Sequence, residues 1–310
     1  MCPNIEPIPE AERRPSIVVC ICTFKRPQLL DRLLSALAKQ RTDGAFEFSV
    51  TVVDNDRSES ARPIAESHAK SGLRVGYHLE PEQNIALARN RAVANAAGDF
   101  IAFIDDDEFP EDNWLITLFN ARRDYNTDGV LGPVLPYFEE PPPAWLVRGK
   151  FYDRPGHKTG TILEWTSTRT GNVLLDARMT LGETYVFDPR LGSGGEDRDF
   201  FKRMIQRGFK FVWCNEAAVH EVVPPQRWTK SFLLRRALLR GQHVMASASY
   251  TRMTVPASLV AIPVYAVALP FLRIAGEHLF MKYLIKICDH LGKCLAAAGI
   301  TVVREKYITE

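Results

Sequence analysis

Three segments in the first third of the chain are almost continuously apolar and rich in β-branched residues. They cover residues 16–23, 48–53 and 100–104. Apolar runs of this length predict strands that are covered on both faces, as in a parallel sheet between layers of helices. Polar residues follow each predicted strand, at 23–26, 54–56 and 105–108.

Helical patterns separate these strands. A helix is predicted from Pro27, because leucines follow it at helical spacing, and another near residues 64–70. A short strand is predicted near 74–78, before a helix that Asn84 would cap and Gly98 would end. This alternation predicts an α/β fold with a mostly parallel sheet and right-handed crossovers. In such sheets, ligands bind beyond the carboxyl ends of the strands, where the polar residues lie.

The middle of the chain has a different pattern. Residues 133–143 contain five prolines, which exclude a regular helix and predict a loop over one edge of the domain. Residues 196–207 have an acidic first turn and predict a helix that ends at Gly208, followed by a strand at 209–214.

An uncharged segment lies near the C-terminus. Residues 253–272 carry no charge and are long enough to cross a bilayer as a helix. Prolines interrupt the segment at positions 256, 263 and 270, and basic residues flank it on both sides. The pattern leaves three interpretations open: a segment that lies on a membrane surface or re-enters it, a spanning helix, and a soluble helical hairpin or oligomer contact.

The composition is that of a folded protein. The 310 residues are 46% hydrophobic and 25% charged, which excludes intrinsic disorder, collagen-like repeats and coiled coils. A net charge of +2 gives no indication of nucleic-acid binding. The charges are unevenly distributed: from Gln226 onward there are twelve basic and four acidic residues, against 27 and 33 in the rest. Such a basic, apolar tail suits an anionic membrane surface.

Cysteine spacing and the N-terminal sequence bear on the compartment. The six cysteines form no CxxC pair, so reduced thiols are favoured over disulfides or a zinc site. The N-terminal residues lack a charged and then apolar signal region, so we expect the body of the protein to stay in the cytoplasm.

Asp105-Asp-Asp-Glu108 is the strongest local signal for chemistry. Four adjacent carboxylates at a strand end repel one another and favour a positive partner. Oxygen ligands select a hard divalent ion such as Mg2+ or Mn2+, which can bridge two phosphates and stabilise a departing diphosphate. The same residues also fit a solvated acidic turn before a helix, and the pattern leaves both interpretations open.

Five further residues each allow a functional and a structural interpretation. Asp54 would accept a hydrogen bond from a nucleobase or ribose, or cap the following turn. Arg89 would face a nucleobase or phosphate, or lie on a helix surface. Asp197, near a predicted helix N-terminus, suits a general base or a helix cap. His220 would bind a metal or fill a structural position, and Trp145 would stack on a sugar ring or plug a loop.

In combination, these motifs resemble a known family. Segments 16–26, 52–56, 84–90, 103–107 and 195–197 occur in the order seen in family 2 glycosyltransferases. Three later features resemble the bacterial exopolysaccharide branch, of the succinoglycan glucosyltransferase type. They are Pro141-Pro-Pro-Ala-Trp145, Thr170-Gly-Asn172 and the set Arg227-Trp, Arg235-Arg and Arg240-Gly241. The resemblance covers about residues 15–245.

The resemblance implies a GT-A fold, a nucleotide-sugar donor (usually a UDP-sugar), a divalent Mg2+ or Mn2+ ion and inversion at the anomeric carbon. It implies that Asp197 is the general base, with Glu196 beside it near the acceptor. The implied donor-binding residues are Thr23, Arg26, Asp54 at the base, Asn84, Arg89, Asp105 near the ribose, and Asp106. The implied metal ligands are Asp107 and His220. The implied acceptor-binding residues are Trp145, Asn172, Arg235 and Arg236.

We therefore expect a GT-A domain at residues 15–224, with a nucleotide-binding half at 15–110 and an acceptor half at 111–224. A basic, apolar helical region would follow at 225–310. Gln226-Arg-Trp228 differs in spacing from the Gln-x-x-Arg-Trp motif of processive synthases, which argues for the transfer of a single sugar.

The expected substrate is a lipid-linked glycan at the cytoplasmic face of a bacterial inner membrane, reached by a peripheral or C-terminally anchored enzyme. Two other functions stay open. One is a nucleotidyltransferase that makes the activated sugar, although no glycine-rich phosphate loop follows the first strand. The other is a non-catalytic scaffold that binds sugar or lipid.

Overall fold

The computed structural model describes residues 13–192, 194–244 and 253–300. The chain divides into two compact units. The first consists of Met1–Leu135 and Arg154–Glu221, and the second of Pro136–Asp153 and Val222–Glu310. The second unit therefore combines most of the proline-rich segment with the C-terminal residues from Val222 onward.

A seven-stranded sheet forms the centre of the first unit, in the order β3-β2-β1-β4-β8-β6-β9. Its strands are β1 (Ser16–Thr23), β2 (Glu47–Asp54), β3 (Val75–Leu79), β4 (Phe100–Ile104), β6 (Gly129–Leu131), β8 (Asn172–Asp176) and β9 (Phe211–Trp213). Strands β1 to β4 pair in parallel, as predicted, and β8 runs antiparallel to β4 and β6. The register places Thr23, at the end of β1, opposite Asp54, at the end of β2.

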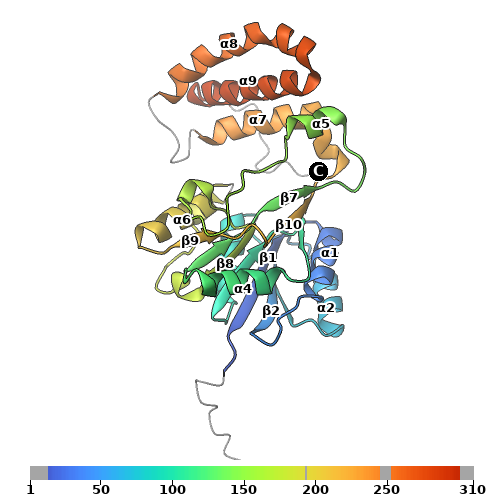
Figure 1. Ribbon diagram of the computed structural model, residues 1–310, viewed down its shortest axis with the longest axis vertical. Helices are drawn as coiled ribbons and strands as arrows, with labels where there is room; N and C mark the ends of the chain where they lie inside the picture. The colour runs from blue at the N-terminus through green and yellow to red at the C-terminus, as the bar shows by residue number, and fades with distance from the viewer. Residues whose placement is uncertain (1–12, 193, 245–252, 301–310) are drawn as a thin grey trace, which may run out of the picture. The chain divides into compact units, whose positions relative to one another are not determined.

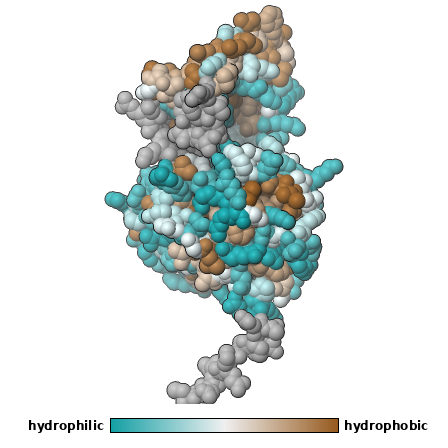
Figure 2. Space-filling view, turned by 90° about the vertical axis from the view of Figure 1, so that its left-hand side faces the viewer, coloured by the Kyte–Doolittle hydropathy of each residue, from teal (hydrophilic) through white to brown (hydrophobic). Residues whose placement is uncertain are grey.

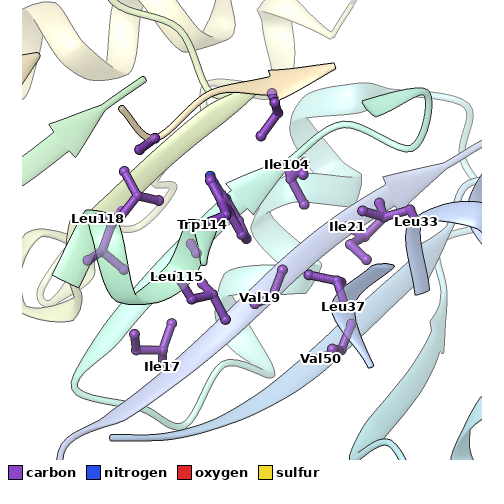
Figure 3. Close-up of a cluster of buried hydrophobic side chains, with 14 of the residues drawn as sticks. Ile17, Val19, Ile21, Leu33, Leu37, Val50, Ile104, Trp114, Leu115 and Leu118 are labelled. Carbon is purple, nitrogen blue, oxygen red and sulfur yellow. The ribbon is translucent and has the colours of Figure 1, made fainter. Parts of the chain in front are cut away.

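Helices cover both faces of this sheet (Figure 1). They are α1 (Pro27–Leu37), α2 (Arg62–Lys70), α3 (Ile85–Ala94), α4 (Trp114–Asp124) and α6 (Glu196–Gln206). Alternate residues of β1 belong to two separate cores. Ile17, Val19 and Ile21 pack with leucines of α1 and with α4 (Figure 3). Val18 and Cys20 pack with α3 and α6 on the other face, and this two-sided burial explains why β1 is apolar throughout.

Two local expectations were wrong. Helix α3 ends at Ala94, so Gly98 does not end it; a Cβ at Gly98 would instead lie 2.9 Å from Val18 Cγ2, and glycine is needed for this close approach. The proline-rich segment is not all loop, because Val134–Tyr137 forms strand β7. It lies at one edge of a three-stranded sheet with β10 (Val219–Val222) and β5 (Glu108–Pro110), and an edge strand tolerates proline.

The second unit is helical, with α5 (Ala144–Gly149), α7 (Lys230–Val244), α8 (Thr254–Ala275) and α9 (Glu277–Ala297). Helices α7 and α9 cross closely at two glycines. A Cβ on Gly241 would be 2.2 Å from the carbonyl oxygen of Asp289, and one on Gly292 would be 2.3 Å from that of Leu238. After Gly276 the chain reverses direction, so that α8 and α9 form a hairpin (Figure 1).

Helix α8 contains the uncharged segment. Among the described residues it is the one helix long and apolar enough to cross a membrane. Pro263 and Pro270 lie inside the helix without ending it, although each proline removes one backbone hydrogen bond. In Figure 1, α8 arches over α9, which is the bend expected when prolines lie along a helix.

Candidate active site

A buried aspartate joins the ends of β1 and β4. Thr23 Oγ1 donates a hydrogen bond to Asp106 Oδ2 at 2.7 Å. Arg26 donates to Asp106 Oδ1 at 3.1 Å and to Asp107 Oδ2 at 3.2 Å. Burial raises the pKa of Asp106 to about 6, although Arg26 acts in the opposite direction. Both oxygens of Asp106 are used within the chain, so this residue organises the turn that carries Asp105 and Asp107.

Asp54 also uses both carboxylate oxygens within the chain. The residue is fully buried; Oδ1 accepts from the Asp56 N–H at 3.0 Å, and Oδ2 accepts from the Ala61 N–H at 2.8 Å and the Tyr77 hydroxyl at 3.1 Å. Burial raises the pKa of Asp54, and these three donors lower it in part. The geometry supports the interpretation that Asp54 organises the turn after β2.

Asn84 caps α3, as predicted. Its Oδ1 accepts from the N–H groups of Ala86 and Leu87 at 3.0 and 3.2 Å. Its Nδ2 donates to the Pro189 carbonyl at 3.0 Å. Asn84 therefore ties the start of α3 to the loop that leads into α6, and this geometry does not support a direct contact with the donor.

Arg89 links two segments of the site. It lies on α3, is 8% exposed, donates a hydrogen bond to Glu196 and forms an ion pair with Asp105 Oδ1 at 3.5 Å. Burial lowers the pKa of Arg89, but Glu196, Asp105 and Asp197 raise it, and the net shift is upward. The guanidinium therefore stays charged and holds the end of β4 next to the start of α6.

The first turn of α6 carries both candidate catalytic carboxylates. Gly194 and Gly195 precede it with φ values of +130° and +98°, a conformation that favours glycine. Glu196 is 4% exposed, and its Oε2 has no hydrogen-bond partner among the described residues. Asp197 is half-buried, and its Oδ1 accepts from the Arg198 N–H at 2.7 Å. No hydrogen bond within the described part of the chain uses Asp197 Oδ2, which leaves an oxygen for a substrate proton.

Two glutamates in the three-stranded sheet belong to the same region: Glu108, the last residue of the acidic motif, and Glu221, which no motif marks. Glu221 of β10 lies opposite Glu108 of β5, and Arg154 forms an ion pair with Glu221. Burial raises the pKa of Glu108, and the charges of Asp105 and Asp107 raise it further. Only the pairing of β5 with β10 brings these groups together, so no local motif could have identified Glu221.

Arg169 is a second residue that sequence reasoning missed. Burial and the neighbouring charge of Arg154 lower its pKa, whereas Glu108 and Asp197 raise it. No hydrogen bond or ion pair holds Arg169 within the described ranges. An arginine so close to Glu108 and Asp197 could bind an anionic group of a substrate.

Gly171 leaves space beside the strand-end carboxylates. A Cβ at this position would be 2.8 Å from Glu108 Oε1 and 3.1 Å from Asp105 Oδ2. Glu108 is 2% exposed, and its Oε1 has no hydrogen-bond partner in the part of the chain that the structure describes. Glycine therefore keeps a small oxygen-lined space that any side chain would fill.

His220 lies on another face of the three-stranded sheet. It pairs with Phe109 across β5 and β10, whereas the neighbouring pair is Glu221 with Glu108, and successive residues of a strand point to opposite faces. The imidazole stacks on Phe109 with ring centroids 5.4 Å apart, and its Nε2 is 3.9 Å from Glu111 Oε1. This placement supports the structural interpretation of His220.

Asn172, a candidate for the acceptor site, is held by its own hydrogen bonds inside the core. It is fully buried, and its Oδ1 accepts from Trp114 Nε1 at 2.8 Å. Its Nδ2 donates to the carbonyls of Pro133 and Ala217 at 3.0 and 2.7 Å. Because every polar atom of the fully buried side-chain amide is used, the hydrogen bonds of Asn172 hold β8 in the core.

The other three acceptor candidates belong to the second unit. Trp145 lies on α5, with its ring centroid 5.4 Å from that of Phe151, and it is partly buried in a small apolar cluster. Arg235 and Arg236 lie on α7 and are exposed. Their assignment to the acceptor stays a hypothesis.

Comparison with known proteins identifies the family. The model for "Glycosyl transferase family 2" matches residues 18–173. The succinoglycan biosynthesis protein ExoM of Rhizobium meliloti is 36% identical over 233 residues, which are 73% of each chain. This chain belongs to glycosyltransferase family 2.

Two solved structures of nucleotide or nucleotide-sugar complexes share the fold. The S. aureus TarS 1–349 complex with UDP-GlcNAc superposes with a TM-score of 0.55 at 14% identity, over 93% of both chains. GalNAc-T7, solved with UDP, GalNAc and Mn2+, superposes with a TM-score of 0.53 at 15% identity, over 72% of this chain and 48% of its own. The family 2 glycosyltransferase described here therefore has the GT-A fold that the sequence predicted.

The carboxylates at the end of β4 fit a divalent ion that also binds phosphate oxygens. No group of three or more His, Cys, Asp or Glu residues able to hold a metal occurs among the described residues. Mg2+ commonly needs only one or two protein carboxylates, because substrate phosphates and waters complete its shell. The space beside Gly171, with Glu108 Oε1 unpartnered and Asp105 Oδ2 next to it, has the hard oxygen donors that such an ion prefers.

Proposed function

We propose that this protein transfers one sugar from a UDP-sugar to a lipid-linked glycan, with inversion at the anomeric carbon, in bacterial exopolysaccharide synthesis. Family 2 membership supports glycosyl transfer over the nucleotidyltransferase and scaffold alternatives. Similarity to a succinoglycan biosynthesis protein supports an exopolysaccharide product. The fold shared with a UDP-GlcNAc complex supports a UDP-sugar donor.

One observation carries the mechanism: Arg89 connects the carboxylate end of β4 to the first turn of α6. Direct displacement needs a leaving-group side and a base side that face each other across the anomeric carbon. Asp105 and Asp107 would form the leaving-group side, and Asp197 would form the base side. We assign the diphosphate to the β4 side and the acceptor hydroxyl to the Asp197 side.

In this mechanism, Asp197 removes the proton from the acceptor hydroxyl as its oxygen attacks the anomeric carbon. The new glycosidic bond forms while the bond between that carbon and the diphosphate oxygen breaks, and UDP leaves with the electron pair. Asp107, with Asp105 and Glu108 nearby, would hold a Mg2+ or Mn2+ ion. When bound, the ion supplies positive charge to the departing diphosphate.

The arginines of the site have separate roles in this proposal. Arg89 holds Glu196 and thereby fixes the start of α6, which orients Asp197. Arg26 fixes the turn of Asp106 and Asp107. Arg169 is available for a substrate anion, and a phosphate of the donor or of a lipid-linked acceptor has the required charge.

A panel of UDP-sugars, assayed for UDP release with Mg2+, with Mn2+ and with chelator, tests the activity. We expect one donor to give slow metal-dependent release without acceptor, because water can replace the acceptor hydroxyl. Asp107→Asn should abolish this release and leave the fold intact. Asp112→Asn, an exposed aspartate in the turn after β5, is the matched control and should retain it.

The outcomes separate the three functions. Release of UDP supports the transferase, and release of pyrophosphate from a nucleoside triphosphate and a sugar phosphate would identify a nucleotidyltransferase. Binding of the sugar nucleotide without any turnover would identify a scaffold. Full activity of Asp107→Asn at saturating Mn2+ would overturn the proposed role of Asp107.

A further inference from the structure

Helix α8 has an apolar stripe that no described residue covers. Its members follow one another at alternating intervals of four and three residues: Val260, Val264, Val267, Phe271 and Ile274. Each is at least 59% exposed, and Ile274 reaches 87%. Intervals of four and three place residues on one line along a helix, so the five form a continuous outer stripe. Figure 2 shows the resulting hydrophobic surface at the top of the second unit.

The opposite side of α8 is attached to α9 through polar and aromatic groups. Ser258 is fully buried; its Oγ donates to the Thr254 carbonyl at 2.7 Å and lies 2.9 Å from His290 Nδ1 of α9. Tyr265, seven residues farther along the same side, meets Tyr283 of α9 edge-on at 5.3 Å. These contacts lie about half a turn away from the outer stripe. The stripe therefore points away from α9.

Helix α9 has the character of a helix at a membrane surface rather than inside a bilayer. It carries Lys282, Lys286, Asp289 and Lys293 at intervals of three or four residues. The ammonium of Lys286 lies over the ring of Tyr283 at 4.7 Å and over that of Tyr265 at 5.6 Å. Lysine and tyrosine at the boundary of an apolar surface are typical of the lipid headgroup region.

The hairpin makes it unfavourable for α8 to span the bilayer. A spanning α8 would either carry the charged helix α9 into the hydrocarbon or lose its contacts with it, and both are unfavourable. Pro263 and Pro270 also leave the carbonyls of Leu259 and Ala266 without their helical N–H donors. Water can satisfy such carbonyls at the interface, whereas inside the hydrocarbon core they need donors from neighbouring helices or side chains.

The charge of the unit favours an anionic surface as the partner of the stripe. Helices α7, α8 and α9 contain eight lysines and arginines and two acidic residues. Both acidic residues already pair with cations: Glu277 with Lys230, and Asp289 with Arg240 and Lys293. A basic helical unit with one apolar stripe matches the pattern of an interfacial amphipathic anchor.

We propose that the α8–α9 hairpin lies flat on one leaflet of an anionic membrane, with the outer stripe inserted among the acyl chains and α9 above it at the headgroups. The proposal rests on the proposed function for its choice of a membrane-bound substrate. It specifies how the enzyme would be held: α8 is an anchor in one leaflet and not a spanning helix.

Flotation of the full-length protein with phosphatidylcholine vesicles, with and without phosphatidylglycerol, tests the proposal. We expect binding to require the anionic lipid and to weaken with salt. The double variant Val267→Asp/Phe271→Asp should reduce binding at least about tenfold, because two side chains lose their insertion into lipid. Ile162→Asp/Leu181→Asp, two residues of the first unit that are each 70% exposed, is the matched control and should bind as the wild type does.

Three results would overturn the inference. Equal binding by the stripe variant would show that the stripe does not insert. Resistance of the bound protein to an alkaline carbonate wash would show that α8 spans the bilayer. If the wild type dimerises in solution and does not bind vesicles, and the stripe variant no longer dimerises, then a second copy of this chain covers the stripe.

UDP release without acceptor should be unchanged in the stripe variant. If neither the wild type nor any variant released UDP, the result would contradict the proposed function but not the proposed membrane anchor.

Discussion

Arg89 donates a hydrogen bond to Glu196, although the two residues are 107 positions apart in the chain. Both are more than nine-tenths buried, and Glu196 directly precedes Asp197. The pair therefore sets the position of the candidate base relative to the strand-end carboxylates. The proposed mechanism therefore depends on a buried interaction between α3 and the first turn of α6.

Loss of the Arg89 charge should destabilise the first unit. Arg89→Met removes the partner of a buried carboxylate at similar volume and should cost about 3–5 kcal/mol in the free energy of unfolding. Glu196→Gln should cost less, because an amide is neutral. In the double variant the loss should be smaller than the sum of the two single losses. Urea unfolding of the four proteins measures this coupling, and strictly additive losses would show that the pair contributes nothing to stability.

The general base can be tested without a known acceptor. Asp197→Asn should lower UDP release to water by about a hundredfold or more, because a positioned base contributes at least that factor. Donor affinity should stay close to that of the wild type. Asp199→Asn changes the same charge in the same helical turn and is the control, since Asp199 pairs with Arg203 at 2.8 Å. If Asp197→Asn instead loses UDP binding and keeps turnover at saturating donor, then Asp197 belongs to the donor pocket and Glu196 becomes the candidate base.

Gly171 should be essential because of the space it leaves. In Gly171→Ala the new methyl group would meet Glu108 Oε1 at 2.8 Å and Asp105 Oδ2 at 3.1 Å. We expect UDP release to fall at least about tenfold, since small displacements of reacting groups have large effects on rate. Gly156→Ala is the control, because its nearest neighbour, Asn215 Oδ1, would be 3.9 Å away. Unchanged activity and metal dependence in Gly171→Ala would show that this space is not part of the site.

Asn172 should matter for stability and not for substrate binding. Asn172→Ala leaves the Trp114 side-chain N–H and the buried Ala217 carbonyl without partners, whereas the Pro133 carbonyl keeps the Val219 N–H, and it should lower the free energy of unfolding by at least about 2 kcal/mol. Asn95→Ala, at an exposed position, should have little effect. The folded fraction of Asn172→Ala should keep wild-type kinetics at low temperature. A raised acceptor KM with unchanged stability would return Asn172 to the acceptor site.

The sequence by itself determined the α/β class, the parallel first half of the sheet and the acidic first turn of α6. These features depend on neighbours in the chain: β1 is apolar at every position because both faces are covered, and Asn84 caps its own helix. Local patterns of this kind persist in any fold that contains them. Residues 23, 54 and 105 could be predicted to lie at strand ends because each directly follows or ends an apolar run in the sequence.

Only the tertiary structure decided which polar side chains bond within the chain and which keep an unused oxygen or nitrogen. Asp106, Asn84 and Asn172 were assigned to substrates because of their positions in motifs, yet their hydrogen-bonding atoms are used inside the chain. Glu221 and Arg169 lie beside the acidic motif because distant segments pack together, and no local pattern marks them. The role of α8 also could not be chosen from the sequence, because its composition fits a spanning helix, a surface helix and a soluble hairpin. The side of α8 that remains exposed depends on α9, because a buried polar group such as Ser258 needs a partner that only the folded hairpin supplies.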